Sequence, residues 1–275
     1  MNISKIKFAC SGHPPNFFKS ELSKQRFGIL EWSANIGLNA QERLMTYGAR
    51  MKEEDAIKFG DLAKKFKIDL SIHGPYYVVL NSLKEQVVKN SIAELIKTIK
   101  LAELMNTKRV VLHPGFGTNL DLFIKRMHQV EKEKPSDVIV RVETMGKLSQ
   151  LGSFEEIIQI CENTECRPCI DFAHVYARSL GKIKTTEDFR QMMIQIENRL
   201  GKKILKELHC HFYPVEFTNK GEKVHRAVTE KNVYPRFKDF APIIKEFQMN
   251  PFLVSESHDS QDLGALEMKK ILKQI

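Results

Sequence analysis

The stretch LSIHGPYY (residues 70–77) is a short apolar run that ends on a histidine, and the same pattern returns along the chain. The further runs of this kind are RVVLHPG (109–115), VIVRVETMGK (138–147), CIDFAHVYAR (169–178), LKELHCHF (205–212) and PFLVSES (251–257). Each is typical of a buried strand that closes on His, Asp or Glu, and they recur about every 30 to 45 residues. This repetition predicts parallel strands joined by helices, with the polar side chains at one common edge.

The whole chain follows the same alternation of strands and helices. We predict strands at residues 5–10, 27–32, 68–73, 108–113, 137–143, 168–173, 204–211 and 251–256. We predict helices between them at residues 53–67, 84–106, 119–133, 153–163, 186–200, 235–248 and 259–274. Eight such units favour a (β/α)8 TIM barrel, expected as a single domain over residues 1–275, because barrels of this kind have about 250 residues. A doubly wound open sheet is the alternative, but it would place its site at one switch point.

The composition favours a polyanionic partner and argues against a membrane. Lys and Arg outnumber Asp and Glu by 43 to 34, which gives a formal net charge of +9. Several basic residues follow predicted strands and would lie on the rim of the barrel: Lys147, Arg178, Lys182, Lys184, Lys220, Lys223 and Arg226. We find no segment that approaches the roughly 20 apolar residues of a membrane span. The odd number of cysteines, 5, suits a reducing compartment, so we expect a cytoplasmic protein, with a monomer as the default.

The strand ends carry side chains that are costly to bury. An ionised carboxylate in an apolar environment needs a positive partner, and a bound metal would serve all of them together. The candidate ligands are His73, His113, Glu143, Asp171, His174, His209, His211, His225 and Glu256. Imidazole and carboxylate without thiolate suit zinc, iron or manganese. For a single histidine a hydrogen-bonded or surface role is the simpler interpretation, but the repetition at strand ends favours a metal centre.

With these segments aligned, the chain resembles endonuclease IV from HGPYY to SES, nearly its whole length. This is the metal-dependent apurinic/apyrimidinic endonuclease family of the xylose-isomerase-like barrels, and the resemblance implies three zinc ions at the rim. It implies a first ion held by His73, His113 and Glu143. It implies a second ion held by Glu143, Asp171, His209 and Glu256, and a third held by His174 and His225.

The sequence departs from the family pattern at the third metal. The family uses an aspartate two residues before the last histidine, and this chain has Lys223 there, which cannot act as a ligand in its place. Either Glu222, one residue away, or His211, which shares the inward face with His209, is expected to take that role. We therefore expect two or three zinc ions, with manganese or iron as the alternative metals.

The resemblance also implies a function. It implies hydrolysis of the phosphodiester 5′ to abasic sites in double-stranded DNA, which leaves a 3′-hydroxyl, and it implies a nucleoid-associated protein. Glu143 would bridge two metals and Glu256 would help to orient the nucleophile, so these are the expected catalytic residues. Tyr76 and Tyr77 match the family's minor-groove insertion position, with loop packing as the other interpretation.

A sugar isomerase or epimerase on the same barrel is the first alternative function, and a metal-binding or DNA-binding relative that has lost its chemistry, favoured only by the missing aspartate, is the second. The sugar enzymes use one divalent ion held by a Glu, Asp, His, Glu set, and Glu143, Asp171, His209 and Glu256 match that set. The additional histidines exceed what one ion requires, and this excess favours the nuclease.

Overall fold

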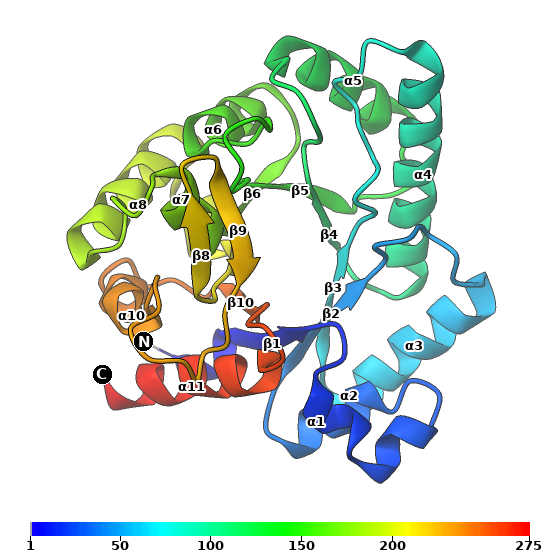
Figure 1. Cartoon of the computed structure of the whole chain (residues 1–275). Coiled ribbons are helices and arrows are strands. Elements are labelled where there is room, and N and C mark those ends of the chain that lie inside the picture. The colour runs from blue at the N-terminus through cyan, green and yellow to red at the C-terminus, as the bar shows by residue number, and fades with distance from the viewer. Residues whose placement is uncertain (1) are drawn as a thin grey trace.

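The computed structural model describes residues 2–275, and its centre is a closed barrel of parallel strands in the order β1-β10-β7-β6-β5-β4-β3-β2 (Figure 1). The strands are β1 (Lys7–Ser11), β2 (Ala40–Leu44), β3 (Asp69–His73), β4 (Arg109–Leu112), β5 (Ile139–Glu143), β6 (Arg167–Asp171), β7 (His209–His211) and β10 (Phe252–Ser255). Helices surround the barrel in Figure 1, so the predicted (β/α)8 TIM barrel is confirmed.

The predicted helices are all present. The outer helices are α2 (Ile29–Asn35), α3 (Glu53–Phe66), α4 (Glu85–Leu104), α5 (Leu120–Glu133), α6 (Phe154–Asn163), α8 (Thr186–Leu200), α10 (Phe237–Glu246) and α11 (Gln261–Gln274). Shorter elements occupy the connections, namely η1 (Ile3–Lys5), α1 (Pro15–Phe18), η2 (Glu21–Lys24), α7 (Phe172–Arg178) and α9 (Lys202–Lys206). Local sequence explains where two of the helices begin, because Ser153 with Glu156 and Thr185 with Asp188 form capping boxes. Among residues 2–275, no helix has both the length and the apolar character to cross a membrane.

Two of the predicted strands were wrong in place or length. The apolar run at 27–32 forms most of helix α2, which buries Ile29, Leu30 and Trp32, and the second strand lies at β2 instead. A short apolar run does not distinguish a buried strand from a buried helix. The first half of the strand predicted at 204–211 is helix α9, and only the three residues of β7 are extended.

Alternating side chains separate the two sides of the barrel wall. On β5, Val140 and Val142 belong to the apolar core between strands and helices, whereas Arg141 and Glu143 occupy the alternate positions that face the barrel interior. The apolar side chains of the interior include a small cluster of Ala9, Ala40, Phe252 and Val254. The interior therefore carries polar side chains above and below this cluster.

An antiparallel hairpin that the sequence did not predict lies beside the opening of the barrel in Figure 1. It consists of β8 (Val215–Thr218) and β9 (Gly221–His225). The hairpin is attached to the loop after β5, where the Glu222 N–H donates to the Gly146 carbonyl at 3.1 Å. Only glycine fits at position 146, because a Cβ there would lie 2.6 Å from the Glu222 Cβ.

Candidate metal centre

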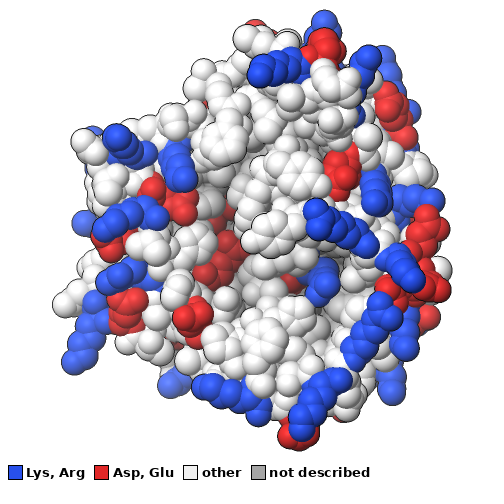
Figure 2. Space-filling model, turned by 45° about the vertical axis from the view of Figure 1, so that its right-hand side comes forward, with Lys and Arg blue, Asp and Glu red and all other residues white. Residues whose placement is uncertain are grey.

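The carboxyl ends of the strands bring most of the predicted ligands to one place, where several three-residue groups of His, Cys, Asp and Glu could hold a metal ion. The predicted residues in these groups are His73, His113, Glu143, Asp171, His174, His209, His211, Glu222, His225 and Glu256. In Figure 2 acidic side chains lie in a hollow of the surface, with Lys and Arg around it. The barrel geometry thus assembles side chains that are far apart in the sequence.

The first group is His73, His113 and Glu143, at the ends of three neighbouring strands. The Nε2 atoms of His73 and His113 lie 3.2 and 3.1 Å from Glu143 Oε2. The two imidazole rings meet edge to face, with centroids 4.8 Å apart. This is the set expected for a first metal ion, and its ligand atoms converge within 4.8 Å of one another.

Three of the histidines are oriented in the same way. The Nδ1 atom of His73 lies 3.0 Å from the Gly74 carbonyl, that of His174 lies 2.7 Å from the Thr144 carbonyl, and that of His225 lies 3.1 Å from the Glu256 carbonyl. When Nδ1–H donates to a carbonyl, the lone pair of the neutral imidazole is on Nε2. The backbone therefore fixes the tautomer that leaves Nε2 free to bind a metal.

The second group is the set of three carboxylates, Glu143, Asp171 and Glu256, around His211, whereas the sequence pointed to His209, which lies in a group with Cys169 and His211. His211 Nδ1 lies 3.4 Å from Glu143 Oε1, 3.8 Å from Asp171 Oδ2 and 3.7 Å from Glu256 Oε1. The ring of His209 lies deeper in the barrel and stacks on Phe252 at 4.8 Å. Both histidines face inward, because they are two residues apart on one strand. They differ only in how deep each ring lies along the barrel axis.

Glu42 is a site residue that the sequence analysis missed. This fully buried carboxylate on β2 has its Oε1 3.1 Å from His211 Nε2 and its Oε2 3.2 Å from His209 Nε2, and it accepts a hydrogen bond from Ser71 Oγ at 2.7 Å. It was missed because the second strand was predicted at 27–32. The alternation of AQERL (40–44), with Ala40 and Glu42 facing inward, was the available signal.

The third group is His174, Glu222 and His225. Glu222 Oε2 lies 3.2 Å from His174 Nε2, and its Oε1 lies 3.3 Å from His225 Nε2. Strand pairing aligns Glu216 with Val224 and Phe217 with Glu222, so Lys223 is an extra residue in β9. This bulge puts Glu222 and His225 on one face although they are three residues apart. Lys223 turns away and binds Glu216 at 2.5 Å.

The carboxylates and imidazoles of the centre shift each other's pKa values. Burial opposes ionisation of Glu143, but the imidazoles of His113 and His211 outweigh it and hold the pKa of this carboxyl well below its ordinary value. Burial would lower the pKa of His73, but its hydrogen bond to Glu143 raises it to about 9. Burial raises the pKa of Asp171 to about 7.

These residues fit a metal ion. Within residues 2–275, neither Glu143 Oε1 nor His211 Nδ1 has a hydrogen-bond partner, although both are buried. Unpartnered buried polar atoms are costly, and a cation between them would remove that cost. Imidazole nitrogen and carboxylate oxygen are also the ligands that zinc accepts in catalytic sites.

Two tyrosines contact the centre and a third lies beside it. Tyr213, which the sequence analysis did not single out, donates its hydroxyl to Asp171 Oδ2 at 2.8 Å and lies 3.2 Å from His174 Nε2. The ring of Tyr76 stacks on His113 with centroids 4.8 Å apart and is 42% exposed. Tyr77 is 52% exposed, and its hydroxyl lies against the loop at Gly48. Tyr76 therefore covers the first group, whereas Tyr77 lies to the side.

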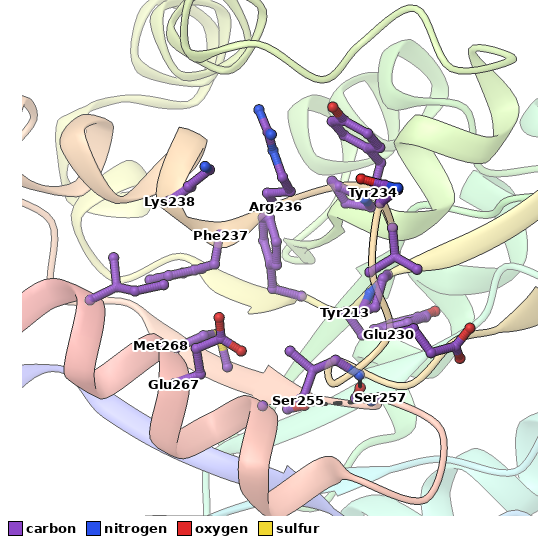
Figure 3. A pocket seen from close by; sticks show the side chains of 18 residues that line it. Tyr213, Glu230, Tyr234, Arg236, Phe237, Lys238, Ser255, Ser257, Glu267 and Met268 are labelled. Atoms are coloured by element: carbon purple, nitrogen blue, oxygen red, sulfur yellow. Dashed lines mark hydrogen bonds between the residues drawn. The ribbon is translucent and has the colours of Figure 1, made fainter.

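A cavity of about 310 Å³ lies on the other side of Tyr213. Figure 3 shows Tyr213, Tyr234 and Arg236 on one side of it and Glu267 and Met268 of α11 on the other. Because the Tyr213 hydroxyl contacts Asp171 while its ring lines the cavity, Tyr213 forms part of the wall between the cavity and the centre.

Comparison with known proteins identifies relatives in sequence. Residues 30–275 match the family model described as xylose isomerase-like TIM barrel. An uncharacterized protein of Methanocaldococcus jannaschii is 30% identical over 250 residues, which cover 86% of this chain and 88% of that protein. Apurinic-apyrimidinic endonuclease 1 of Plasmodium berghei is 28% identical over 179 residues, which cover 58% of this chain and 34% of that longer protein.

Solved structures share the fold. Endonuclease IV from Thermus thermophilus has a TM-score of 0.72 at 17% identity, over 98% of this chain and 99% of that chain. A D-tagatose 3-epimerase-like protein has a TM-score of 0.69 at 17% identity, over 98% of this chain and 96% of that chain. At these identities the likeness establishes the barrel, and neighbours of both functional classes share it.

Proposed function

The chain belongs to the xylose isomerase-like TIM barrel family, and on that premise we propose that it is a metal-dependent DNA repair endonuclease. Its reaction would be hydrolysis of the phosphodiester 5′ to an abasic site, leaving a 3′-hydroxyl. The observation that carries this proposal is that three candidate metal groups adjoin one another. Glu143 and Asp171 lie between the first group and the His174, Glu222, His225 group. An enzyme that uses one ion would not need the third group.

We assign the ligands from the distances in the centre. The first ion would be held by His73, His113 and Glu143, the second by Glu143, Asp171, His211 and Glu256, and the third by His174, Glu222 and His225. His211 replaces His209 in this proposal because its Nδ1 faces the three carboxylates. Zinc is the metal we propose, and when bound it lowers the pKa of a coordinated water toward neutrality and offsets negative charge on the phosphate.

The residues of the chain hold and orient the reacting groups. Glu143 belongs to the ligand sets of both the first and the second ion, so its carboxylate would hold the two ions near each other. Glu256 accepts a hydrogen bond from Ser11 Oγ at 3.1 Å and keeps its side chain 11% exposed, which suits a carboxylate that orients the attacking water. The Tyr213 hydroxyl, donated to Asp171, would keep that carboxylate turned toward the centre.

The rim around the centre suits a nucleic acid. Loops after the first five strands of the chain expose large apolar side chains, namely Phe18, Tyr47, Tyr76, Tyr77, Phe116 and Leu148. Aromatic rings stack on bases, and lysines and arginines on the rim attract phosphates. We propose that Tyr76 enters the gap left by the missing base, because its ring already lies over His113.

We also propose that the chain acts as one domain and as a monomer. The barrel closes where β1 pairs with β10, strands from the two ends of the sequence, and α11 packs on both. In this proposal DNA, rather than a second copy of the chain, covers the exposed rim.

A sugar isomerase or epimerase is the second candidate. The specific observation in its favour is that Glu143, Asp171 and Glu256 each have a carboxylate oxygen within 3.8 Å of His211 Nδ1, so these four residues could hold one divalent ion. On this alternative the third group would stay free of metal.

The test is incision of a short DNA duplex that carries one abasic analogue, with the metal content measured on the same sample. We expect cleavage 5′ to the lesion, loss of activity on prolonged chelation, and two or three zinc ions per chain. Glu103→Gln, on the exposed face of α4, is the matched control for Glu143→Gln. A protein that holds one ion, leaves the duplex intact and epimerises ketoses such as D-tagatose would instead support the sugar enzyme.

A further inference from the structure

The opposite end of the barrel contains three arginines on adjacent strands. Arg109 and Arg167 are the first residues of β4 and β6, and Arg141 on β5 is aligned with Arg167. Arg141 lies two residues before Glu143 on the same inward face, so it occupies the layer below the metal centre. All three side chains therefore belong to the amino-terminal end of the barrel interior, which we call the barrel floor.

The barrel floor contains a cavity of about 250 Å³. The charged residues that line it are Asp69, Lys108, Arg109, Arg141, Arg167 and Glu207. A phosphate ion is much smaller than this volume, so a small ligand would enter without a change in the barrel.

The acidic residues of the cavity are already paired. Asp69 binds Lys7 at 2.9 Å, and Glu207 lies 3.3 Å from Arg167. Lys108 pairs with Asp137 outside the cavity. Among the described residues, neither of these carboxylates forms an ion pair with Arg109 or Arg141.

Arg109 and Arg141 remain without an anionic partner. Over residues 2–275 neither guanidinium forms an ion pair, and the Nε atom of each is buried without a hydrogen-bond partner. Arg141 is only 4% exposed, and Arg109 lies over the ring of Phe252 at 5.0 Å. Two unpaired positive charges at one cavity are unfavourable unless an anion joins them.

Two carboxylates attract these arginines from beyond ion-pair distance. Asp69 and Glu207 both attract Arg109, and Glu207 also attracts Arg141, but each carboxylate already binds another cation. Because the lining has four basic residues, Lys108, Arg109, Arg141 and Arg167, and only these two acidic ones, the cavity keeps an excess of positive charge.

We propose that the barrel floor is a second binding site, separate from the metal centre, which binds a dianionic phosphoryl group between Arg109 and Arg141. Guanidinium groups donate paired N–H bonds to phosphate oxygens, and two unpaired arginines match the charge of a phosphate dianion. The ligand is either inorganic phosphate or the phosphate of a small nucleotide. Because the site lies at the other end of the barrel from Glu143, it does not hold the phosphate that the enzyme would cleave.

The first experiment is calorimetric titration of the purified protein with inorganic phosphate. We expect Arg141→Met and Arg109→Met each to weaken binding at this site by roughly tenfold to a hundredfold, as loss of a charge-assisted hydrogen bond does. Arg190→Met, which removes a half-buried arginine paired with Glu246 on the outer helices, should leave the affinity unchanged. Unchanged affinity in both cavity variants would overturn the proposal.

The metal centre could also bind phosphate, so the two sites must be separated. In Glu143→Gln, phosphate binding that depends on Arg141 should persist, whether or not the protein is a nuclease. If all phosphate binding disappears in Glu143→Gln, the barrel-floor site does not exist.

A crystal grown with tungstate provides a readout that does not depend on the folding of a variant. We expect an anomalous peak between Arg109 and Arg141, and its absence at a concentration that saturates the titration would contradict the proposal. Competition with adenosine monophosphate distinguishes the two sources: equal or tighter binding identifies a nucleotide phosphate, and failure to compete identifies inorganic phosphate.

Discussion

The strand-borne and hairpin-borne parts of the metal centre differ in how they are held. Glu143, Asp171 and His211 stand on strands that pair on both sides, and all three side chains are fully buried. Glu222 and His225 stand on a hairpin that pairs with itself, with side chains 16% and 30% exposed. We infer that the first two groups are as stable as the barrel, whereas the third group depends on the docking of one hairpin.

The largest effect is expected when the residue shared by the strand-borne groups is changed. Glu143→Gln keeps the shape of the side chain but removes the charge that the first two groups share. We expect incision to fall by roughly a thousandfold, because metal sites supply several kcal/mol of charge stabilisation in the transition state. We also expect the metal content to fall by more than one ion. Incision kinetics and metal analysis measure both, and near-normal metal content would mean that the strand-borne groups do not depend on Glu143.

A change in the hairpin should have a smaller and more selective effect. In Glu222→Gln we expect the loss of about one metal ion and a decrease in incision of roughly tenfold to a hundredfold, while the thermal stability of the barrel is kept. Lys223→Met is the matched control, because this side chain points away from the centre and binds Glu216.

The same hairpin provides a stricter test of the bulge. Adding Lys223→Asp to Glu222→Gln recreates the family's aspartate position, but the bulge directs residue 223 away from the centre. We therefore expect no recovery of the lost ion, and full recovery would show that the hairpin takes the regular register.

Gly146→Ala should separate the two regions without replacing a ligand. The new Cβ would lie 2.6 Å from the Glu222 Cβ and 3.0 Å from His174 Cδ2, so the hairpin must move away. We expect weaker binding of one metal ion, a decrease in incision of about tenfold, and destabilisation of about 1–3 kcal/mol as in other overpacked sites. Metal content and thermal unfolding provide the readouts, with Lys220→Ala on the same hairpin turn as the control; loss of all metal would contradict the separation.

The smallest effect concerns pH and the strand-borne groups. In the folded protein, the hydrogen bond to Glu143 raises the pKa of His73 from 6.5 to about 9. In metal-free protein, the His73–Glu143 pair therefore stabilises the fold fully below pH 6.5, and this contribution is lost as pH rises through 9. Metal binding requires neutral imidazole, so zinc affinity should change in the opposite direction and rise with pH. Thermal unfolding at several pH values between 6.5 and 9 measures how stability changes with pH, once without and once with zinc. If the two pH dependences are equal, His73 is not a zinc ligand.

Most of the barrel could be predicted from the sequence because its strands repeat one local pattern. The runs that end at His73, Glu143 and Asp171 are short, apolar and followed by a polar residue. One local segment therefore predicts both the strand and the functional residue at its end. Strand β2 was missed for the converse reason. Its letters AQERL are mostly polar, since this strand directs Glu42 into the centre, and the apolar run before it is a helix.

The local patterns in the sequence determine the repeating βα architecture, the end of the barrel that carries the chemistry, and most of the histidines and carboxylates gathered there. Three-dimensional packing was needed to establish which of His209 and His211 faces the carboxylates, whether Glu222 or Lys223 turns inward, and that Arg109 and Arg141 share a cavity. These outcomes depend on strand stagger, a bulge and contacts between distant strands, and the order of residues along one strand carries none of that information.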